Sequence, residues 1–147
     1  MPLSWNEIRN NSRAFAKAWK NVSEERAEAQ SFWNEFFEVF GLSRRRVASF
    51  EKKAPTETGT QGRIDLFWKG TLLVEHKSRG RDLDKAYEQG LGYFSGLKAE
   101  ELPRFVLVSD FARFRLYALD EDEQHIFDLE ALADNIHLFG FIAGYQQ

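Results

Sequence analysis

Two carboxylates and a lysine occur at a spacing that suits metal-dependent hydrolysis. Asp65 and Glu75 are separated by nine residues, and Lys77 follows Glu75 with one residue between them. Carboxylate oxygens bind hard divalent cations such as Mg²⁺ or Mn²⁺, and an ammonium group beside a metal-bound water can orient that water or help to deprotonate it. The three residue types therefore indicate machinery for hydrolysing phosphodiester bonds.

This chemistry requires the three side chains to share one face of a sheet, which depends on the turn between their strands. Side chains alternate along a strand, so Glu75 and Lys77 share a face whatever the turn. A two-residue turn would pair Asp65 with Val74 and point it away from them. A three-residue turn over residues 68–70, with Gly70 in the left-handed conformation, would pair Asp65 with Leu73 instead. We expect the three-residue turn.

Helices and strands can be assigned around this motif from the hydrophobic periodicity. The first forty residues predict two helices, because large apolar residues recur at intervals of three, four and seven. Ser23 is expected to cap the second helix, and Gly41 to end it. Residues 44–53 contain a possible strand, and residues 54–62 have the composition of a mobile loop.

The rest of the chain continues the same mixed pattern. Residues 62–78 predict two strands, and Asp82 is expected to begin a helix that runs to about Lys98. Two more strands are expected over 105–110 and 113–119, and then a final helix with Asp128 as its cap. The order is ααβββαββα, which predicts an α/β fold with a mixed central sheet flanked by helices.

Composition excludes several classes of protein. The 147 residues suffice for one domain, and the lack of cysteine excludes disulfides, thiolate metal sites and a cysteine nucleophile. No apolar run approaches the ~20 residues of a membrane span, so a cytoplasmic protein is expected. His125 and His137 have no partner at metal-ligand spacing, which argues against zinc. His76 should point to the opposite face of the sheet from Glu75 and serve the structure.

Charge is distributed unevenly along the chain. The net charge of −3 argues against tight binding of nucleic acid by electrostatics alone. Two basic clusters nevertheless occur. The first contains Arg44, Arg45, Arg46, Lys52 and Lys53, and the second contains Lys77, Arg79, Arg81 and Lys85. Either cluster would also be compatible with an ordinary solvated surface.

Residues 62–78 read GRIDLFWKGTLLVEHKS. In this segment Asp65, Glu75 and Lys77 resemble the PD-(D/E)xK nuclease motif, with Ile64 in place of its proline. The resemblance implies a restriction-endonuclease-like core. In it, Asp65 and Glu75 bind Mg²⁺ or Mn²⁺, and Lys77 acts on the attacking water.

Further residues enter through the same resemblance. Gln89 and Tyr93 are similar to the Gln-x-x-x-Tyr motif of RecB-type nucleases, although an ordinary core tyrosine would give the same spacing. The resemblance implies that these two residues bind DNA, and we assign Arg79 and Lys85 to the same surface. Glu35 is the candidate for a further metal-binding acid from the preceding helix, with Glu38 as the alternative.

Nearly the whole chain resembles the N-terminal nuclease domain of MmeI-like restriction-modification enzymes. The resemblance is carried by AQSFW at 29–33, VSDF at 108–111 and FGFIAGY at 139–145. It implies a single nuclease domain from a longer polypeptide, whose other domains would methylate adenine with S-adenosylmethionine and recognise the target. Double-strand cleavage would imply either dimerisation or sequential cuts. The alternatives are a stand-alone repair or phage nuclease and a catalytically silent DNA-binding or scaffold domain.

Overall fold

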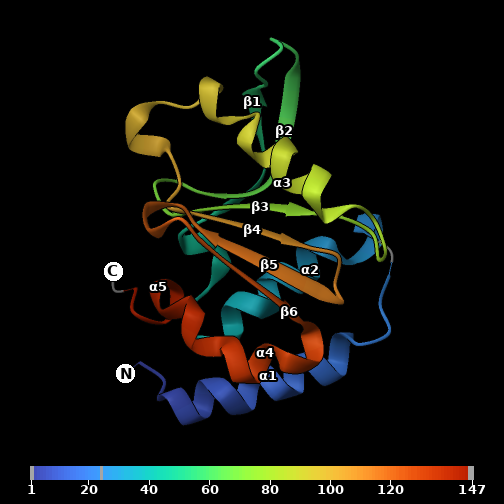
Figure 1. Cartoon of the computed structure of the whole chain (residues 1–147). Helices are drawn as coiled ribbons and strands as arrows, with labels where there is room; N and C mark the ends of the chain where they lie inside the picture. The colour runs from blue at the N-terminus through green and yellow to red at the C-terminus, as the bar shows by residue number, and fades with distance from the viewer. Residues whose placement is uncertain (1, 24, 146–147) are drawn as a thin grey trace.

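A mixed six-stranded sheet forms the centre of the computed structural model, which describes residues 2–23 and 25–145. The strands follow one another across the sheet in chain order (Figure 1). They are β1 (Ser49–Pro55), β2 (Gln61–Trp68), β3 (Leu72–His76), β4 (Phe105–Ser109), β5 (Arg113–Ala118) and β6 (Glu123–Asp128). Neighbours are antiparallel except β3 and β4, which are parallel and joined through helix α3 (Leu83–Leu91). The predicted mixed α/β fold is confirmed, although β6 was not predicted.

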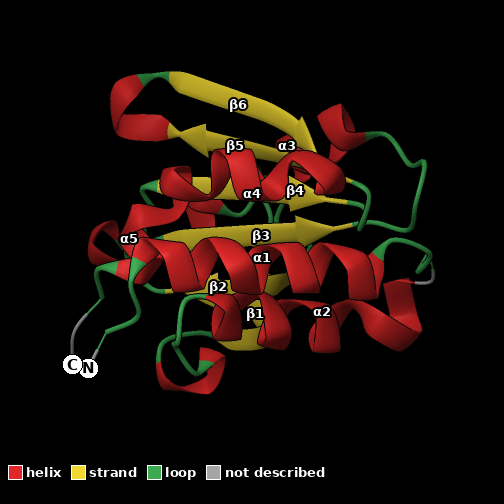
Figure 2. Ribbon diagram, turned by 90° about the horizontal axis from the view of Figure 1, so that it is seen from below, coloured by secondary structure: helices red, strands yellow, loops and turns green. Residues whose placement is uncertain are grey.

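Helices cover both faces of the sheet. One face carries α1 (Trp5–Trp19), α2 (Glu25–Val39), α4 (Leu132–Asn135) and α5 (Gly140–Ala143), and α3 lies on the other (Figure 2). The two predicted N-terminal helices are confirmed. Ser4 and Glu7 form a capping box at the start of α1, and Gly41, with a φ of +78°, follows the end of α2. The expected cap at Ser23 depends on residue 24, which lies outside the described residues.

The main core lies between the sheet and the α1–α2 side. Aromatic rings dominate it, and Phe32, Phe36 and Phe114 are fully buried among further rings. The spacing of large residues on α2 explains this arrangement, because one helix face meets the sheet and another meets α1. A smaller core under α3 contains Leu73 and Tyr93. The sheet that carries the candidate site is therefore packed on both faces.

The segment before β2 differs from its prediction. Residues 44–46 form a 3₁₀ turn, and the first strand begins only at Ser49 and runs to Pro55. The predicted loop over 54–62 is wrong in extent, because Ala54 and Pro55 pair with Gly62 and Gln61. Only residues 56–60 form the turn, and their three threonine hydroxyls hydrogen-bond to one another.

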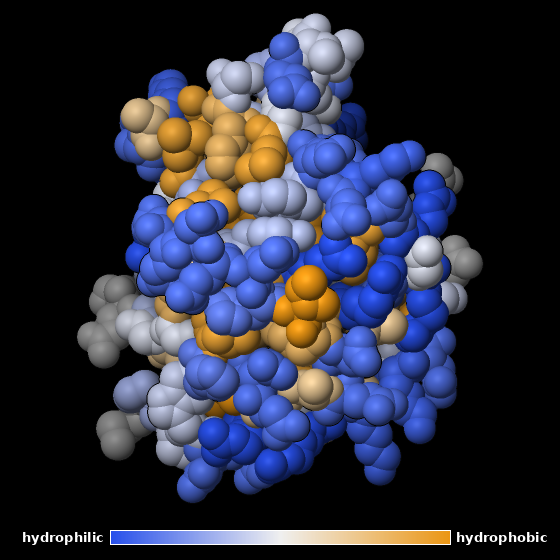
Figure 3. Space-filling model, viewed as in Figure 1, coloured by the Kyte–Doolittle hydropathy of each residue, from blue (hydrophilic) through white to orange (hydrophobic). Residues whose placement is uncertain are grey.

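Helix boundaries in the second half also differ. Asp82 caps α3 as predicted, accepting hydrogen bonds from the amides of residues 84 and 85, but the helix ends at Leu91 rather than near residue 98. Two 3₁₀ turns follow, η2 (Phe94–Gly96) and η3 (Ala99–Glu101). Figure 3 shows hydrophobic side chains gathered over this segment on an otherwise largely hydrophilic face.

The C-terminal segment packs against the sheet. Instead of one helix, the chain forms η5 (Leu129–Ala131), α4, η6 (Ile136–Phe139) and α5, and the side chain of Asp128 makes no capping bond. Phe139 is fully buried, and the ring of Phe141 stacks on Phe105 with centroids 4.0 Å apart. Among the described residues, no helix is both long and apolar enough to cross a membrane.

Candidate functional site

The turn between β2 and β3 sets the register of the candidate site. It has three residues, as predicted, but they are 69–71 rather than 68–70, so Trp68 pairs with Leu72. Gly70 has a φ of +71° and supplies the left-handed residue. The expected pairing of Asp65 with Leu73 is therefore wrong. The register instead places Asp65 opposite Glu75, with the same consequence that their side chains belong to one face.

Asp65 lies where β2 and β3 stop pairing. Leu66 and Val74 form the last pair at this end of the ladder, and beyond it the Oδ2 of Asp65 accepts a hydrogen bond of 2.7 Å from the amide of His76. A side-chain carboxylate thus takes the place of a strand carbonyl. This contact fixes the half-buried carboxylate of Asp65 beside the Glu-x-Lys segment of β3.

Glu75 is held beneath α3. Its side chain is only 1% exposed. A Cβ atom added at Gly90 would lie 3.5 Å from Cγ of Glu75 and 3.1 Å from Leu73, so the glycine allows the helix to approach the sheet closely. This close approach explains the glycine in the interior of α3.

Lys77 reaches the solvent edge of the same site. Its Nζ donates a hydrogen bond of 2.8 Å to Oε1 of Gln89 on α3. The Lys77 amide bonds to the carbonyl of Ser109, which continues the β3–β4 pairing past the end of β3. The structure therefore brings the lysine and Gln89 together as a polar pair at the mouth of the site.

Tyr93 lies at the buried side of the site. It is 2% exposed, and its hydroxyl donates to the carbonyl of Arg63 at 2.8 Å. Burial raises the pKa of Tyr93, and the negative charges of Glu75 and Asp65 raise it further. The phenol is thus within electrostatic reach of both carboxylates. Tyr93 lies just beyond the end of α3, where its side chain hydrogen-bonds to that of Gln89, and its burial leaves it little surface for direct contact with DNA.

The tyrosine also explains a glycine in the motif. A Cβ atom at Gly62 would lie 2.7 Å from Cε1 of Tyr93, closer than folded proteins allow. The ring therefore packs directly on the backbone of β2, three residues before Asp65.

The donor set fits a magnesium-like ion. Asp65 and Glu75 supply carboxylate oxygens from neighbouring strands, and the residues that the structure describes contain no cluster of three or more acidic or histidine side chains that could hold a metal. Mg²⁺ characteristically takes one or two protein carboxylates and completes its shell with water and substrate phosphates. Two carboxylates beside a polar opening are compatible with that chemistry.

Two predicted site residues lie elsewhere. Glu35 accepts a hydrogen bond from the indole of Trp19, at the contact between α2 and α1, so it does not join Asp65. Arg79 donates to the carbonyls of Lys20 and Val22 and so caps the end of α1. Its guanidinium is occupied in holding the fold rather than presented to a ligand.

Lys85 and Glu38 complete the set of predicted residues. Lys85 is exposed on α3, one helical turn before Gln89, so the two can lie on the same side of the helix. Glu38 is exposed near the end of α2. Of the predicted DNA-binding residues, Gln89 and Lys85 therefore lie at the surface near the site.

His76 has the structural role that alternation predicts. It is fully buried on the α2 side, where its Nδ1 accepts a hydrogen bond of 3.0 Å from the indole of Trp33. The edge of the imidazole meets Phe111 at a centroid distance of 4.3 Å. Burial lowers the pKa of His76 to about 3, so the ring is neutral at physiological pH.

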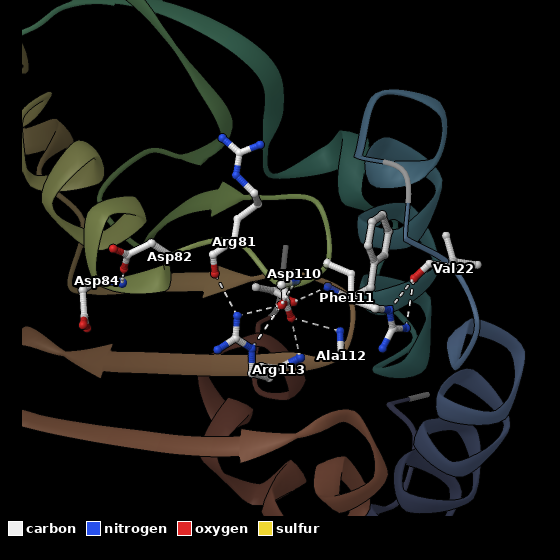
Figure 4. Close-up of polar contacts among 11 residues, drawn as sticks. Val22, Arg81, Asp82, Asp84, Asp110, Phe111, Ala112 and Arg113 are labelled. Atoms are coloured by element: carbon white, nitrogen blue, oxygen red, sulfur yellow. Dashed lines mark hydrogen bonds and ion pairs between the residues drawn. The ribbon is translucent and has the colours of Figure 1, made fainter.

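A buried acid that sequence reasoning missed organises the segment after Lys77. Asp110, between β4 and β5, accepts hydrogen bonds from the amides of Gly80, Ala112 and Arg113 and from the Arg113 guanidinium (Figure 4). Arg113 also donates to the carbonyl of Arg81 at 2.8 Å. An acid directly after an apolar strand with an arginine three residues later was the available clue. The two residues tie the β4–β5 turn to the chain between Lys77 and α3.

A hollow of about 350 Å³ opens beside Asp65. We call it the Asp65 hollow; Gln30 and Ser31 of α2 and Glu51 of β1 contribute to its lining. Glu51 has a φ of +57° and follows Phe50, whose partner is Leu66, so this strained residue lies across the ladder from Asp65. Such backbone conformations cost on the order of 1–3 kcal/mol and cluster at functional sites.

Comparisons with known proteins identify a family and a similar fold. No curated protein sequence matches the chain. Among solved structures, the chain is similar to one described as the cryo-electron microscopy structure of the DrdV–DNA complex, with a TM-score of 0.57 and 18% identity over 97% of this chain. The chain spans only 14% of that protein, and at this identity the likeness establishes the fold alone. The family model described as MmeI, N-terminal domain, matches residues 10–147. The match covers the acids, the lysine and the helix above them, and the chain therefore belongs to the MmeI N-terminal domain family.

Proposed function

We propose that the chain is a metal-dependent DNA endonuclease module, the cleavage part of a restriction-modification enzyme. The observation that carries the proposal is the meeting of Asp65, Glu75 and the Lys77–Gln89 pair at one end of the β2–β3 ladder. Membership of the MmeI N-terminal domain family supports it.

Each residue would have a distinct part in hydrolysis. Asp65 and Glu75 would hold Mg²⁺ or Mn²⁺, which when bound supplies charge neutralisation at the scissile phosphate. Lys77, kept at the solvent edge by Gln89, would orient the attacking water and help to remove its proton. Tyr93 closes the buried side and limits the entry of other water.

The family suggests how such a module would be used. A net charge of −3 gives weak intrinsic attraction to DNA, so the module alone would cleave feebly, and efficient cleavage would depend on tethered domains that place it on its target. We propose double-stranded DNA as the substrate and the cytoplasm as its location. S-adenosylmethionine would serve only a methyltransferase domain, and two modules would pair to cut both strands.

Metal binding tests this proposal without requiring cleavage. Isothermal titration of Mn²⁺ into the chain mixed with a short duplex should show binding that Glu75→Gln weakens at least tenfold. Lys17→Gln, an exposed substitution on α1, is the matched control and should bind like the wild type. Equal Mn²⁺ binding by the Glu75 variant would reject the proposed site and favour a catalytically silent DNA-binding domain.

A further inference from the structure

A second hollow, on the edge strand β1, is lined mainly by positive charge. It has a volume of about 360 Å³, and we call it the basic hollow. Its charged lining residues are Arg45, Arg46, Lys52, Lys69 and Glu101. Four cations and one carboxylate thus gather in one place on a chain whose net charge is −3. Such a concentration points to an anionic ligand.

The side chain of Arg44 is held by contacts within the fold. Arg44 donates to the side chain of Asn34 and to the carbonyl of Ala48, both at 2.8 Å, and its guanidinium lies 4.0 Å from the centre of the Phe50 ring. This first arginine of the cluster therefore anchors the 3₁₀ turn. Arg45 and Arg46 are exposed beside it.

Lys52 and Lys69 are positioned by contacts with Phe67 and Glu101. Lys52 extends over the ring of Phe67, with its Nζ 5.5 Å from the ring centre, and lies 4.0 Å from the carboxylate of Glu101. The amide of Gly70 donates to the carbonyl of Glu101, which fixes the turn that carries Lys69. The basic hollow is thus built from ordered elements on both sides.

Glu101 does not neutralise the basic hollow. A hydrogen bond from the amide of Lys98 lowers the pKa of Glu101, and the charges of Lys52, Lys98 and Lys69 lower it further. The carboxylate is therefore ionised, but the surrounding cations outnumber it.

The basic hollow and the Asp65 hollow are both lined in part by β1. Phe50 and Glu51 line the Asp65 hollow, whereas Ser49 and Lys52 line the basic hollow. Lys69 lies four positions after Asp65, at the start of the turn that follows β2, which is a distance of ~13 Å at the rise of a strand. The major groove of DNA is about 12 Å wide. A duplex held at Asp65 could therefore place a phosphate across the groove in the basic hollow.

We propose that the basic hollow binds the phosphodiester backbone of duplex DNA across the groove from the cleaved bond. The choice of duplex DNA as the ligand rests on the proposed function, because the position beside Asp65 favours it over an acidic protein surface. The hollow would position the duplex without reading its sequence.

The test is DNA binding in the absence of metal, so that it does not depend on cleavage. Fluorescence anisotropy of a labelled 20-base-pair duplex would be measured over a range of low salt concentrations. The variant Arg45→Gln/Lys69→Gln should reduce the slope of log affinity against log salt by about 0.9 for each lost phosphate contact. The control Arg9→Gln/Arg13→Gln removes the same charge from α1 and should change the slope by less than half as much.

Each other result overturns the inference. Equal losses in the two double variants would mean that only net charge matters. An unchanged slope would mean that the basic hollow makes no phosphate contact, and no binding at the lowest salt would exclude a DNA contact. A separate nicking assay of the wild type with Mn²⁺ distinguishes the two proposals. A slope difference without nicking would support the basic hollow but not the nuclease, and nicking without a slope difference would support the nuclease but not the basic hollow.

Discussion

The carboxylate of Asp65 accepts a hydrogen bond from the backbone amide of His76, so the acid on β2 is attached to the residue between Glu75 and Lys77. One contact thereby aligns the three proposed catalytic residues. It also terminates the β2–β3 ladder, because the carboxylate occupies the position that a strand carbonyl would take. The Asp65 carboxylate therefore both ends the β2–β3 pairing and positions the proposed catalytic residues.

Replacing Asp65 should separate its two roles. Asp65→Asn keeps an oxygen that can accept the amide of His76 but removes the charge, so we expect metal binding to weaken at least tenfold with little change in stability. Asp65→Ala also loses the hydrogen bond and should lower the free energy of unfolding by about 1–2 kcal/mol. Urea titration and calorimetry would measure the two effects. Unreduced metal binding by Asp65→Asn would rule out Asp65 as a ligand.

Gln89 should act through Lys77. Gln89→Leu removes the oxygen that holds the ammonium, and we expect Mn²⁺-dependent nicking to slow roughly tenfold, less than the 10²–10⁴-fold loss expected for Lys77→Ala. Gln89→Glu keeps an acceptor and should retain more activity. The control Glu88→Leu changes an exposed neighbour on α3. Single-turnover assays would measure the nicking rates. A Gln89→Leu rate equal to that of the wild type would contradict the proposal that Gln89 positions Lys77.

Asp110 should make stability depend on pH in acid. Burial alone would raise its pKa, but the hydrogen bonds from Arg113 and from the Gly80 amide outweigh burial and hold the pKa below its ordinary value of 3.8. The unfolded chain therefore takes up a proton first as the pH falls, and the stabilisation that is complete well above pH 4 is lost below it.

Asp110→Asn removes this linkage. At pH 7 it should lower the free energy of unfolding by about 2–3 kcal/mol, because hydrogen bonds to a buried charge are lost. Urea unfolding at pH 7 and pH 3 should show the difference between wild type and variant shrinking at the lower pH. A difference of the same size at both would contradict the assigned titration.

Gly90 should tolerate no large side chain. A Cβ there already approaches Leu73 to 3.1 Å, so Gly90→Leu would push α3 away from Glu75 and should cost about 1–3 kcal/mol of stability. Gly140→Ala, where an added Cβ meets nothing within 4 Å, is the control and should be neutral or slightly stabilising. Thermal unfolding would measure both variants. An unchanged melting temperature for Gly90→Leu would show that the helix is less closely packed than described.

The sequence predicted the elements that repeat a simple pattern. The N-terminal helices, the three-residue turn and the structural role of His76 follow from periodicity, from a glycine and from strand alternation. The turn was misplaced by one residue because Trp68 can serve in either a turn or a strand, and its packing against distant aromatic residues, Phe37, Phe141 and Tyr145, favours the strand.

Other features depend on contacts between distant residues. Glu35 occurs among core aromatics in the sequence, but its position is decided by Trp19 on another helix. Arg79 appears in a basic cluster, yet it caps the end of α1 from more than fifty residues away. β6 was missed because its exposed edge carries polar residues around Ile126 and lacks the apolar alternation of a covered strand.

Nicking of supercoiled plasmid at low salt with Mn²⁺ is the most direct test of the central claim. The wild type should convert supercoiled to open-circular DNA, while Glu75→Gln and Lys77→Ala should not, although all three remain folded by circular dichroism. Lys17→Gln should nick at the wild-type rate. Nicking that persists undiminished in both site variants would contradict the assignment of Glu75 and Lys77 as the groups that cleave DNA.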